Sequence, residues 1–132
     1  MSIKYKLIRQ NVPGEKGTGN YNYCVRACER NKVDLNEVAR IITERSSFSR
    51  GDVVGVLTGL VDLIPELLLE NKSIELGELG IFSLYLKSDT TKVPRVDSYR
   101  LIKSVKMQFR PGVKIKRALL FPDFTKSKTS EY

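Results

Sequence analysis

The sequence of 132 residues contains no histidine. Histidine is the side chain that most readily acts as a general base near neutral pH, because its ordinary pKa lies there. The sequence also contains no P-loop, no G-x-G-x-x-G and no G-x-S-x-G motif. We therefore expect a protein that is not an enzyme, with no catalytic residues, no cofactor and no small-molecule substrate.

Cysteine is scarce, with Cys24 and Cys28 as the two examples. A zinc site usually needs four nitrogen or sulfur ligands, so one chain cannot complete such a site. A four-cysteine site shared between two chains is the remaining metal alternative. Two free thiols packed on a small sheet are the simpler reading, and they fit a reducing compartment. We expect no bound metal.

Long apolar runs are also missing, because no stretch of 18 apolar residues occurs. The first ten residues are basic, but they lack the apolar run and the small-residue cleavage site of a secretory signal. The sequence therefore predicts a cytoplasmic protein with no membrane partner.

Basic residues dominate the charge, with a formal net charge of +8, and they are unevenly spread. Seven basic and two acidic residues give residues 1–33 a charge of +5, whereas four basic and nine acidic residues give residues 34–86 a charge of −5. Twelve basic and four acidic residues give residues 87–132 a charge of +8. We expect binding of a polyanion at chosen faces rather than over the whole surface.

The segment 87–117 holds ten basic and two acidic residues and directly follows an apolar block. An ordinary solvated surface is the alternative, but this imbalance on an extended ribbon favours contacts with a phosphate backbone. The candidate contacts are Lys87, Lys92, Arg95, Arg100, Lys103, Lys106, Arg110, Lys114, Lys116 and Arg117. Arg95 is the strongest basic candidate, because it adjoins Pro94 and because arginine suits a narrow minor groove.

The pattern of apolar residues predicts an α+β protein. Strands at 3–9 and 21–28 would form an N-terminal β-hairpin over residues 1–30, with a loop at 11–20. Helices are expected at 35–45 and 50–71, with Asp34 and Ser49 as N-caps. The apolar stripe of the second helix is wider than one short helix can cover, which indicates a dimer.

The C-terminal half is expected to be mainly strand. A tight turn at Gly77–Gly80 lies within paired strands over 74–86, and a returning strand at 101–109 closes an arm at about 85–108. A short helix follows at 113–120, which completes a domain over 31–124. Residues 125–132 are expected to be a disordered polar tail.

This order of elements resembles the HU/IHF family of bacterial histone-like DNA-binding proteins. Residues 74–84 (IELGELGIFSL) are similar to the family's G-F-G-x-F turn, although Glu78 and Leu79 stand in place of its first Gly and Phe. Residues 107–120 (MQFRPGVKIKRALL) are similar to its Phe-x-x-Gly-Lys-x-Leu segment. The hairpin at 1–30 is absent from the standard family and resembles the longer HU-like proteins of Bacteroides-type bacteria.

The resemblance implies an intertwined homodimer with a helical body, whose small antiparallel sheet extends into two basic β-ribbon arms. In that family the arms wrap the minor groove of duplex DNA, and a proline near each tip wedges between base pairs. The resemblance gives this role to Pro94, for which a plain turn proline is the alternative. The implied function is that of a nucleoid protein that bends DNA with weak sequence preference.

Two other functions remain open at this level. The same fold could serve as a structural or interaction module whose arm docks an acidic protein or a cell-envelope partner. The basic arm together with the tyrosines of the hairpin could alternatively bind RNA.

Overall fold

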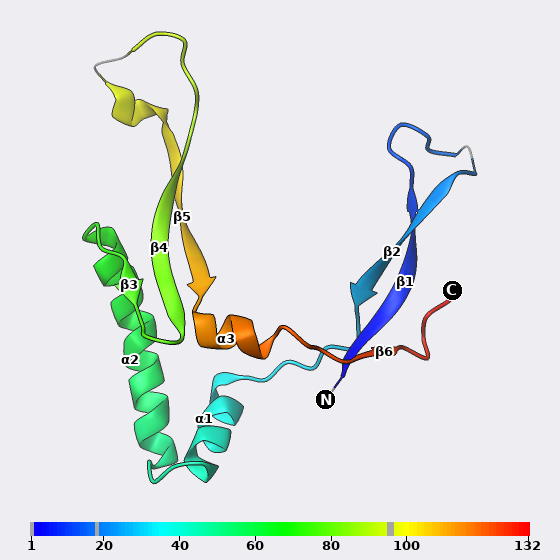
Figure 1. Cartoon of the computed structure of the whole chain (residues 1–132). Helices are drawn as coiled ribbons and strands as arrows, with labels where there is room; N and C mark the ends of the chain where they lie inside the picture. Colours follow the sequence, from blue (N-terminus) through cyan, green and yellow to red (C-terminus); the bar gives the residue numbers. More distant parts are fainter. Residues whose placement is uncertain (1, 18, 95–96) are drawn as a thin grey trace. The chain divides into compact units, whose positions relative to one another are not determined.

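The structure is a computed structural model that describes residues 2–17, 19–94 and 97–132. It contains helices and small sheets, as expected for the α+β class (Figure 1). The chain divides into two compact units. We call Met1–Val33 together with Leu120–Tyr132 the hairpin unit, and Asp34–Leu119 the helical unit. The hairpin unit therefore combines segments from both sides of the helical unit, whereas the sequence predicted a domain that continued to residue 124.

A three-stranded sheet forms the hairpin unit. Strands β1 (Ile3–Asn11) and β2 (Tyr21–Ala27) are antiparallel, in agreement with the predicted hairpin. Strand β6 (Phe124–Lys126) lies parallel to β1 along its other edge. The backbone N–H of Ser127 extends this contact by donating to the carbonyl of Tyr5 at 2.8 Å.

The tail at 125–132, which the sequence predicts to be disordered, begins instead with the end of strand β6 in the structure. Its first residues satisfy backbone groups on the open edge of β1, which is a gain that a polar sequence can make without burying apolar side chains. Glu29 holds the next residues, because its carboxylate accepts from the hydroxyl of Ser127 and, at 3.4 Å, from that of Thr129. Lys4 donates to the same carboxylate at 2.8 Å, and these bonds keep the pKa of Glu29 below its ordinary value.

Two capped helices begin the helical unit. Helix α1 (Leu35–Glu44) starts at Asp34, whose side chain accepts from the N–H of Glu37 at 2.8 Å. Helix α2 (Arg50–Leu69) starts at Ser49, whose hydroxyl accepts from the N–H of Asp52 at 3.1 Å. Both predicted N-caps are therefore confirmed, and they satisfy donors that the first turn of a helix leaves open.

A second antiparallel sheet follows α2. It contains β3 (Ile74–Glu75), β4 (Gly80–Ser88) and β5 (Ile102–Pro111), in the order β3-β4-β5. The two long strands form a ribbon that projects from the helices (Figure 1). A 3₁₀ helix, η1 (Ser98–Leu101), precedes β5, and helix α3 (Val113–Ala118) follows it.

Two glycines allow close backbone packing at the base of this ribbon. Gly80 has φ +140°, and a Cβ atom placed there would lie 2.2 Å from the carbonyl oxygen of Arg110. A Cβ atom at Gly112 would lie 2.2 Å from the carbonyl oxygen of Glu78. Glycine is therefore required at both positions, and Gly80 stands at the end of the tight turn predicted at Gly77–Gly80.

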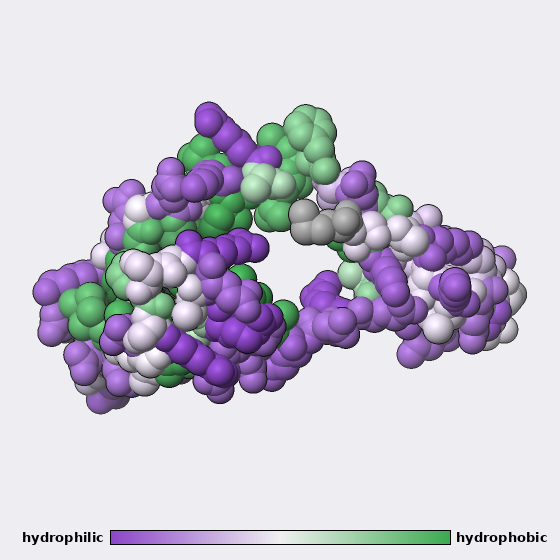
Figure 2. Space-filling model, turned by 90° about the horizontal axis from the view of Figure 1, so that it is seen from below, coloured by the Kyte–Doolittle hydropathy of each residue, from purple (hydrophilic) through white to green (hydrophobic). Residues whose placement is uncertain are grey.

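Few apolar side chains are buried within this one chain. Among the described residues, the buried hydrophobic side chains are Ala39, Val53, Leu68 and Ile74. By contrast, Val56 on α2 is 72% exposed and Leu69 is 75% exposed. Figure 2 shows green, hydrophobic residues at the surface among purple, hydrophilic ones. Helix α2 is apolar on most of its circumference, which is the pattern of a helix that is buried on several sides.

Candidate nucleic-acid interface

The register of β4 and β5 divides the ribbon into two chemically different faces. Residues directly opposite each other in an antiparallel pair share a face, and faces alternate along each strand. One face, which we call the apolar face, carries the pairs Phe82–Phe109, Leu84–Met107 and Leu86–Val105. The other, which we call the basic face, carries Ile81–Arg110, Ser83–Gln108, Tyr85–Lys106 and Lys87–Ser104.

The basic face brings together three of the predicted contacts, Lys87, Lys106 and Arg110. None of the eight residues that form this face is acidic. Among the described residues, none of these three cations has an ion-pair partner, and all three are exposed. Three unpaired positive charges therefore follow one side of an extended ribbon, which suits them to contact with a phosphate backbone.

Tyr85 and Gln108 lie on the same face, and the sequence reasoning did not select them. Tyr85 is 47% exposed and stands opposite Lys106. Both side chains can donate hydrogen bonds to phosphate or sugar oxygens. The sequence contained the information needed to find them, because side chains two residues apart on a strand lie on the same face. Tyr85 is two residues from Lys87, and Gln108 is two residues from Lys106.

Other predicted contacts are engaged with acids near the far end of the ribbon. The register shifts at Lys87/Ser88, and Lys103 lies beside this irregularity. Lys103 forms an ion pair with Asp89 at 2.8 Å, and this contact raises the pKa of Lys103. Arg100 lies 3.4 Å from the carboxylate of Asp97. Since the cation of each pair is exposed and Asp97 is only half-buried, each pair contributes little to stability and can be exchanged for a phosphate.

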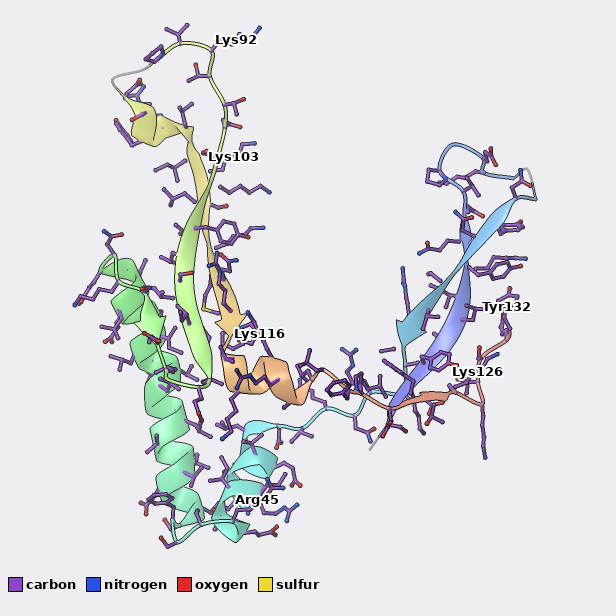
Figure 3. The ribbon with its side chains drawn as sticks, in the orientation of Figure 1. Arg45, Lys92, Lys103, Lys116, Lys126 and Tyr132 are labelled. Atoms are coloured by element: carbon purple, nitrogen blue, oxygen red, sulfur yellow. The ribbon has the colours of Figure 1, made fainter. Side chains whose placement is uncertain are left out.

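The tip of the ribbon extends from the end of β4 to η1. Pro94 is exposed there and belongs to no strand, and Thr91 makes hydrogen bonds of 3.2 and 3.4 Å to the backbone of Val93. Lys92 stands at the outer end of the ribbon (Figure 3). The predicted contact Arg95 lies outside the described residues.

Helix α3 carries the remaining predicted contacts at the base of the ribbon. Lys114 forms an ion pair with Glu78 at 3.3 Å. Lys116 and Arg117 lie in the last turn and are exposed, and Figure 3 shows Lys116 near the base while Lys103 lies farther along the ribbon. The cations of this unit thus extend from the tip to α3.

Releasing Lys103 from its acid tests whether the ion pair limits binding of a polyanion. Asp89→Asn is expected to tighten duplex DNA binding and to steepen the slope of log K against log salt by up to about 0.9, the value for one added phosphate contact. Fluorescence anisotropy across a salt series measures both quantities. Asp62→Asn on α2 removes the same charge away from the ribbon and is the control; an equal effect of the two variants would contradict a local role for Asp89.

Other kinds of site find little support in the described part of the chain. No group of three or more cysteine, aspartate or glutamate side chains in those ranges could hold a metal ion. Cys24 and Cys28 are both half-buried and free. Among the helices of the described residues, none is long and apolar enough to cross a membrane.

Comparisons with known proteins place these observations in context. A family model described as "HU domain fused to wHTH, Ig, or Glycine-rich motif" (HU-HIG) matches residues 1–126, a range that includes the hairpin strands β1 and β2. No curated protein matches the chain.

A solved structure from Bacteroides vulgatus, described as a candidate bacterial DNA-binding protein, is similar in fold. Its TM-score is 0.65 at 10% sequence identity, and the match covers 99% of this chain. The chain spans about half of that protein, since 51% of its length is covered.

Proposed function

Because the chain belongs to the HU-HIG family, which confirms the resemblance drawn from its sequence, we propose that it is a non-enzymatic architectural protein that binds and bends duplex DNA. The observation that carries this proposal is the basic face of the β4–β5 ribbon, with Lys87, Lys106 and Arg110 exposed and without acidic partners among the described residues. We place its action on the bacterial chromosome, in the nucleoid.

The ribbon is better suited to binding in the minor groove than to recognising a base sequence in the major groove. Its basic face offers cations and hydroxyl or amide groups, which bind phosphates and sugars without selecting a base. The minor groove itself reveals little beyond A·T against G·C content. We therefore expect weak sequence preference, with Lys92, Lys116 and Arg117 extending the contact and Arg100, Lys103 and Lys114 joining it when phosphates replace their acids.

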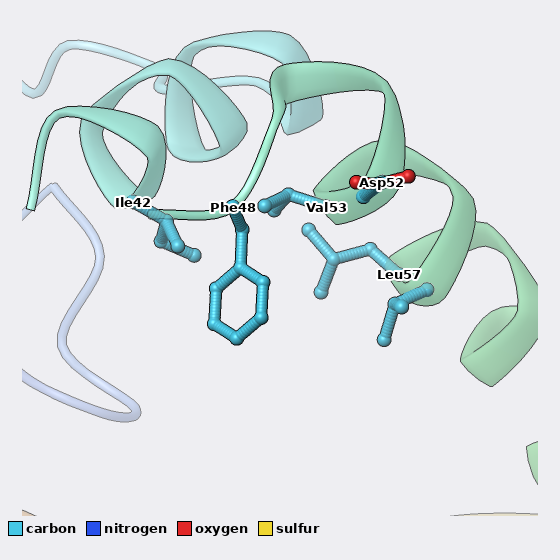
Figure 4. A pocket seen from close by; sticks show the side chains of 6 residues that line it. Ile42, Phe48, Asp52, Val53 and Leu57 are labelled. Atoms are coloured by element: carbon cyan, nitrogen blue, oxygen red, sulfur yellow. The ribbon is translucent and has the colours of Figure 1, made fainter. Parts of the chain in front are cut away.

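A homodimer is part of the proposal, because one chain buries too few apolar side chains to explain its stability. Burial of a single large apolar side chain contributes about 1.5–3 kcal/mol to the free energy of folding. The exposed apolar residues of α2 would therefore add considerable stability if a second chain covered them. A hollow of about 290 Å³ lined by Ile42, Phe48 and Leu57, among others, lies beside α1 and α2 (Figure 4). Phe48 is 63% exposed there, and apolar side chains of a second copy would cover it.

The first test is binding to a duplex of fixed length, either intact or with a central two-nucleotide gap, over a salt series. Bending a short site costs about 1–6 kcal/mol by elastic estimates, so a gapped duplex that bends freely should bind more tightly. The slope of log K against log salt should steepen by about 0.9 for each neutralised phosphate. Absence of duplex binding by a folded dimer at low salt would overturn the proposal.

Pro94 is the residue to which we assign the wedge that stabilises a kink. Pro94→Ala is expected to reduce the bend angle severalfold more than it reduces affinity, because the phosphate contacts of the ribbon remain while the apolar wedge between base pairs is lost. Fluorescence resonance energy transfer between the ends of a labelled duplex measures the bend, and anisotropy measures the affinity. Pro122→Ala is the control, and equal bend angles for Pro94→Ala and the unmodified protein would remove this assignment.

A further inference from the structure

The hairpin unit is more strongly basic than the unit that carries the ribbon. Residues 1–33 have a charge of +5, and residues 120–132 add two basic and two acidic residues, so the hairpin unit carries +5 in total. The helical unit is almost twice as long, yet its fourteen basic and eleven acidic residues leave only +3. A second concentration of positive charge therefore lies in the hairpin unit, apart from the basic segment 87–117 of the ribbon.

The register of β1 and β2 places two of these cations directly opposite each other. Lys6 pairs with Arg26, and Lys4, two residues earlier on β1, shares the same face. Both Lys6 and Arg26 are exposed, and neither has an ion-pair partner among the described residues. Like charges directly opposite each other destabilise a sheet. This arrangement has an electrostatic cost that a bound anion would remove.

Glu29, the first acidic residue after β2, already has other partners. Glu29 follows β2, and it binds Lys4 at 2.8 Å as well as the hydroxyls of Ser127 and Thr129. The remaining pairs on the face, Ile8–Cys24 and Gln10–Asn22, carry no charge. Lys6 and Arg26 thus form a cationic pair on which no acid of the described residues closes an ion pair, although Glu131 lines the same shallow hollow as Lys6.

The opposite face of the same sheet has a different chemistry. Arg9 lies over the ring of Tyr21 at 4.1 Å from its centroid, and Tyr23 meets Tyr132 edge to face with ring centroids 5.3 Å apart. These rings are already in contact with other side chains of the unit, so they are poor platforms for stacking unpaired bases. The unused chemistry of the hairpin unit is cationic rather than aromatic, and it matches a phosphate backbone better than single-stranded RNA.

We propose that the Lys6–Arg26 face of the hairpin unit is a second phosphate-binding surface, which contacts the backbone of the same duplex outside the segment held by the ribbon. This inference rests on the proposed function, because it assumes that the ribbon binds duplex DNA. Contacts on one chain add avidity, because the first contact raises the effective concentration of the second. The hairpin unit thereby lengthens the DNA site without adding sequence preference.

The test combines the double variant Lys6→Gln/Arg26→Gln with two duplex lengths. On a duplex long enough for both surfaces, this variant should lower the magnitude of the salt slope by about 1.8 per chain, which corresponds to two lost phosphate contacts. The second duplex is shortened until the salt slope of the unmodified protein falls no further, so that only the ribbon finds room on it. On this duplex the variant and the unmodified protein should bind with equal affinity. Thermal unfolding should show equal or higher stability of the variant, because a like-charge pair has been removed.

A matched control removes the same charge from the same unit. Lys16→Gln/Lys32→Gln alters two exposed lysines that lie outside β1 and β2. Equal losses for the two double variants would mean that only net charge matters, and this would overturn the inference. The single variant Arg26→Gln, which leaves Lys6 in place, gives a second reading if the double variant fails to fold, with an expected slope change of about 0.9.

The outcomes separate this inference from the proposed function. The ribbon variant Lys106→Gln/Arg110→Gln should weaken binding to both duplex lengths. If that holds while the hairpin variant behaves as the unmodified protein on the long duplex, the second surface is absent and the proposed function stands. Failure of the unmodified protein to bind any duplex overturns both. Capture of polyglutamate, with no hairpin-dependent change in duplex binding, would assign the face to an acidic protein and overturn the inference.

Discussion

Val56→Glu is expected to abolish the proposed dimer and, with it, most of the folded helical unit. Val56 is 72% exposed in one chain although it lies on an apolar helix, and it lines the hollow beside Phe48. In a dimer it would be covered, so a glutamate there would have to lose its hydration without a partner, a cost well above the roughly 1.5–3 kcal/mol of the lost apolar burial. Because few side chains are buried within one chain, the separated chains should not remain folded.

Light scattering after gel filtration gives the mass, and far-ultraviolet circular dichroism gives the helix content, as a function of protein concentration. Thr58→Glu is the control, because Thr58 lies on the other side of α2, one and two turns before Asp62 and Glu66. It should remain dimeric with a loss of only a few tenths of a kcal/mol from repulsion by Asp62. A folded, monomeric Val56→Glu protein would contradict the dependence of folding on the dimer, and a dimer as stable as the unmodified one would place the interface elsewhere.

Gly80→Ala is expected to destabilise the base of the ribbon by about 2–6 kcal/mol, the sum of a strained backbone conformation and an overpacked contact. At φ +140° an L-residue is strained, and the added Cβ would also lie 2.2 Å from the carbonyl oxygen of Arg110 and 2.8 Å from the ring of Phe109. Relief requires β4 and β5 to separate where the ribbon begins. DNA affinity should therefore fall together with stability, although Gly80 itself offers no group to a phosphate.

Chemical denaturation followed by circular dichroism measures the loss of stability, and anisotropy measures DNA affinity on the same samples. Gly14→Ala is the control for backbone strain alone, because Gly14 has φ +82° but no atom within 4 Å of an added Cβ. Its cost should be about 1–2 kcal/mol, that of a left-handed residue. Equal losses of stability for the two variants would show that the protein accommodates the added Cβ at Gly80 at no further cost. The close backbone packing at Gly80 would then not be what stabilises the base of the ribbon.

Sequence reasoning located the helices and the ribbon because each has a strong local signal. Asp34 and Ser49 cap their helices as predicted, since a short oxygen-bearing side chain three residues before an N–H donor is a local arrangement. The extent of the ribbon followed from alternation and from the basic residues between Phe82 and Phe109, whose rings lie 4.8 Å apart. These are features that neighbours in the sequence determine.

The parts that sequence reasoning did not find depend on distant partners. Strand β6 is three residues long and polar, so only its contact with β1 makes it a strand. The engagement of Lys103 with Asp89 joins residues from the two sides of the tip, and a charge count cannot reveal it. For this reason the list of candidate contacts drew no distinction between cations with and without acidic partners, whereas the structure separates Arg100, Lys103 and Lys114 from Lys87, Lys106 and Arg110.

The place of β6 has a consequence for the order of folding. Its residue Thr125 donates a hydrogen bond to Ser2 at 2.8 Å across 123 positions of the chain, so the sheet of the hairpin unit joins segments that lie before and after the helical unit in the sequence. A two-stranded hairpin alone is at best marginally stable in water. Contacts between such distant residues form slowly, because a long loop must close before they are made. The helical unit, whose contacts are more local in sequence, should therefore gain structure during translation before β6 completes the sheet with β1 and β2.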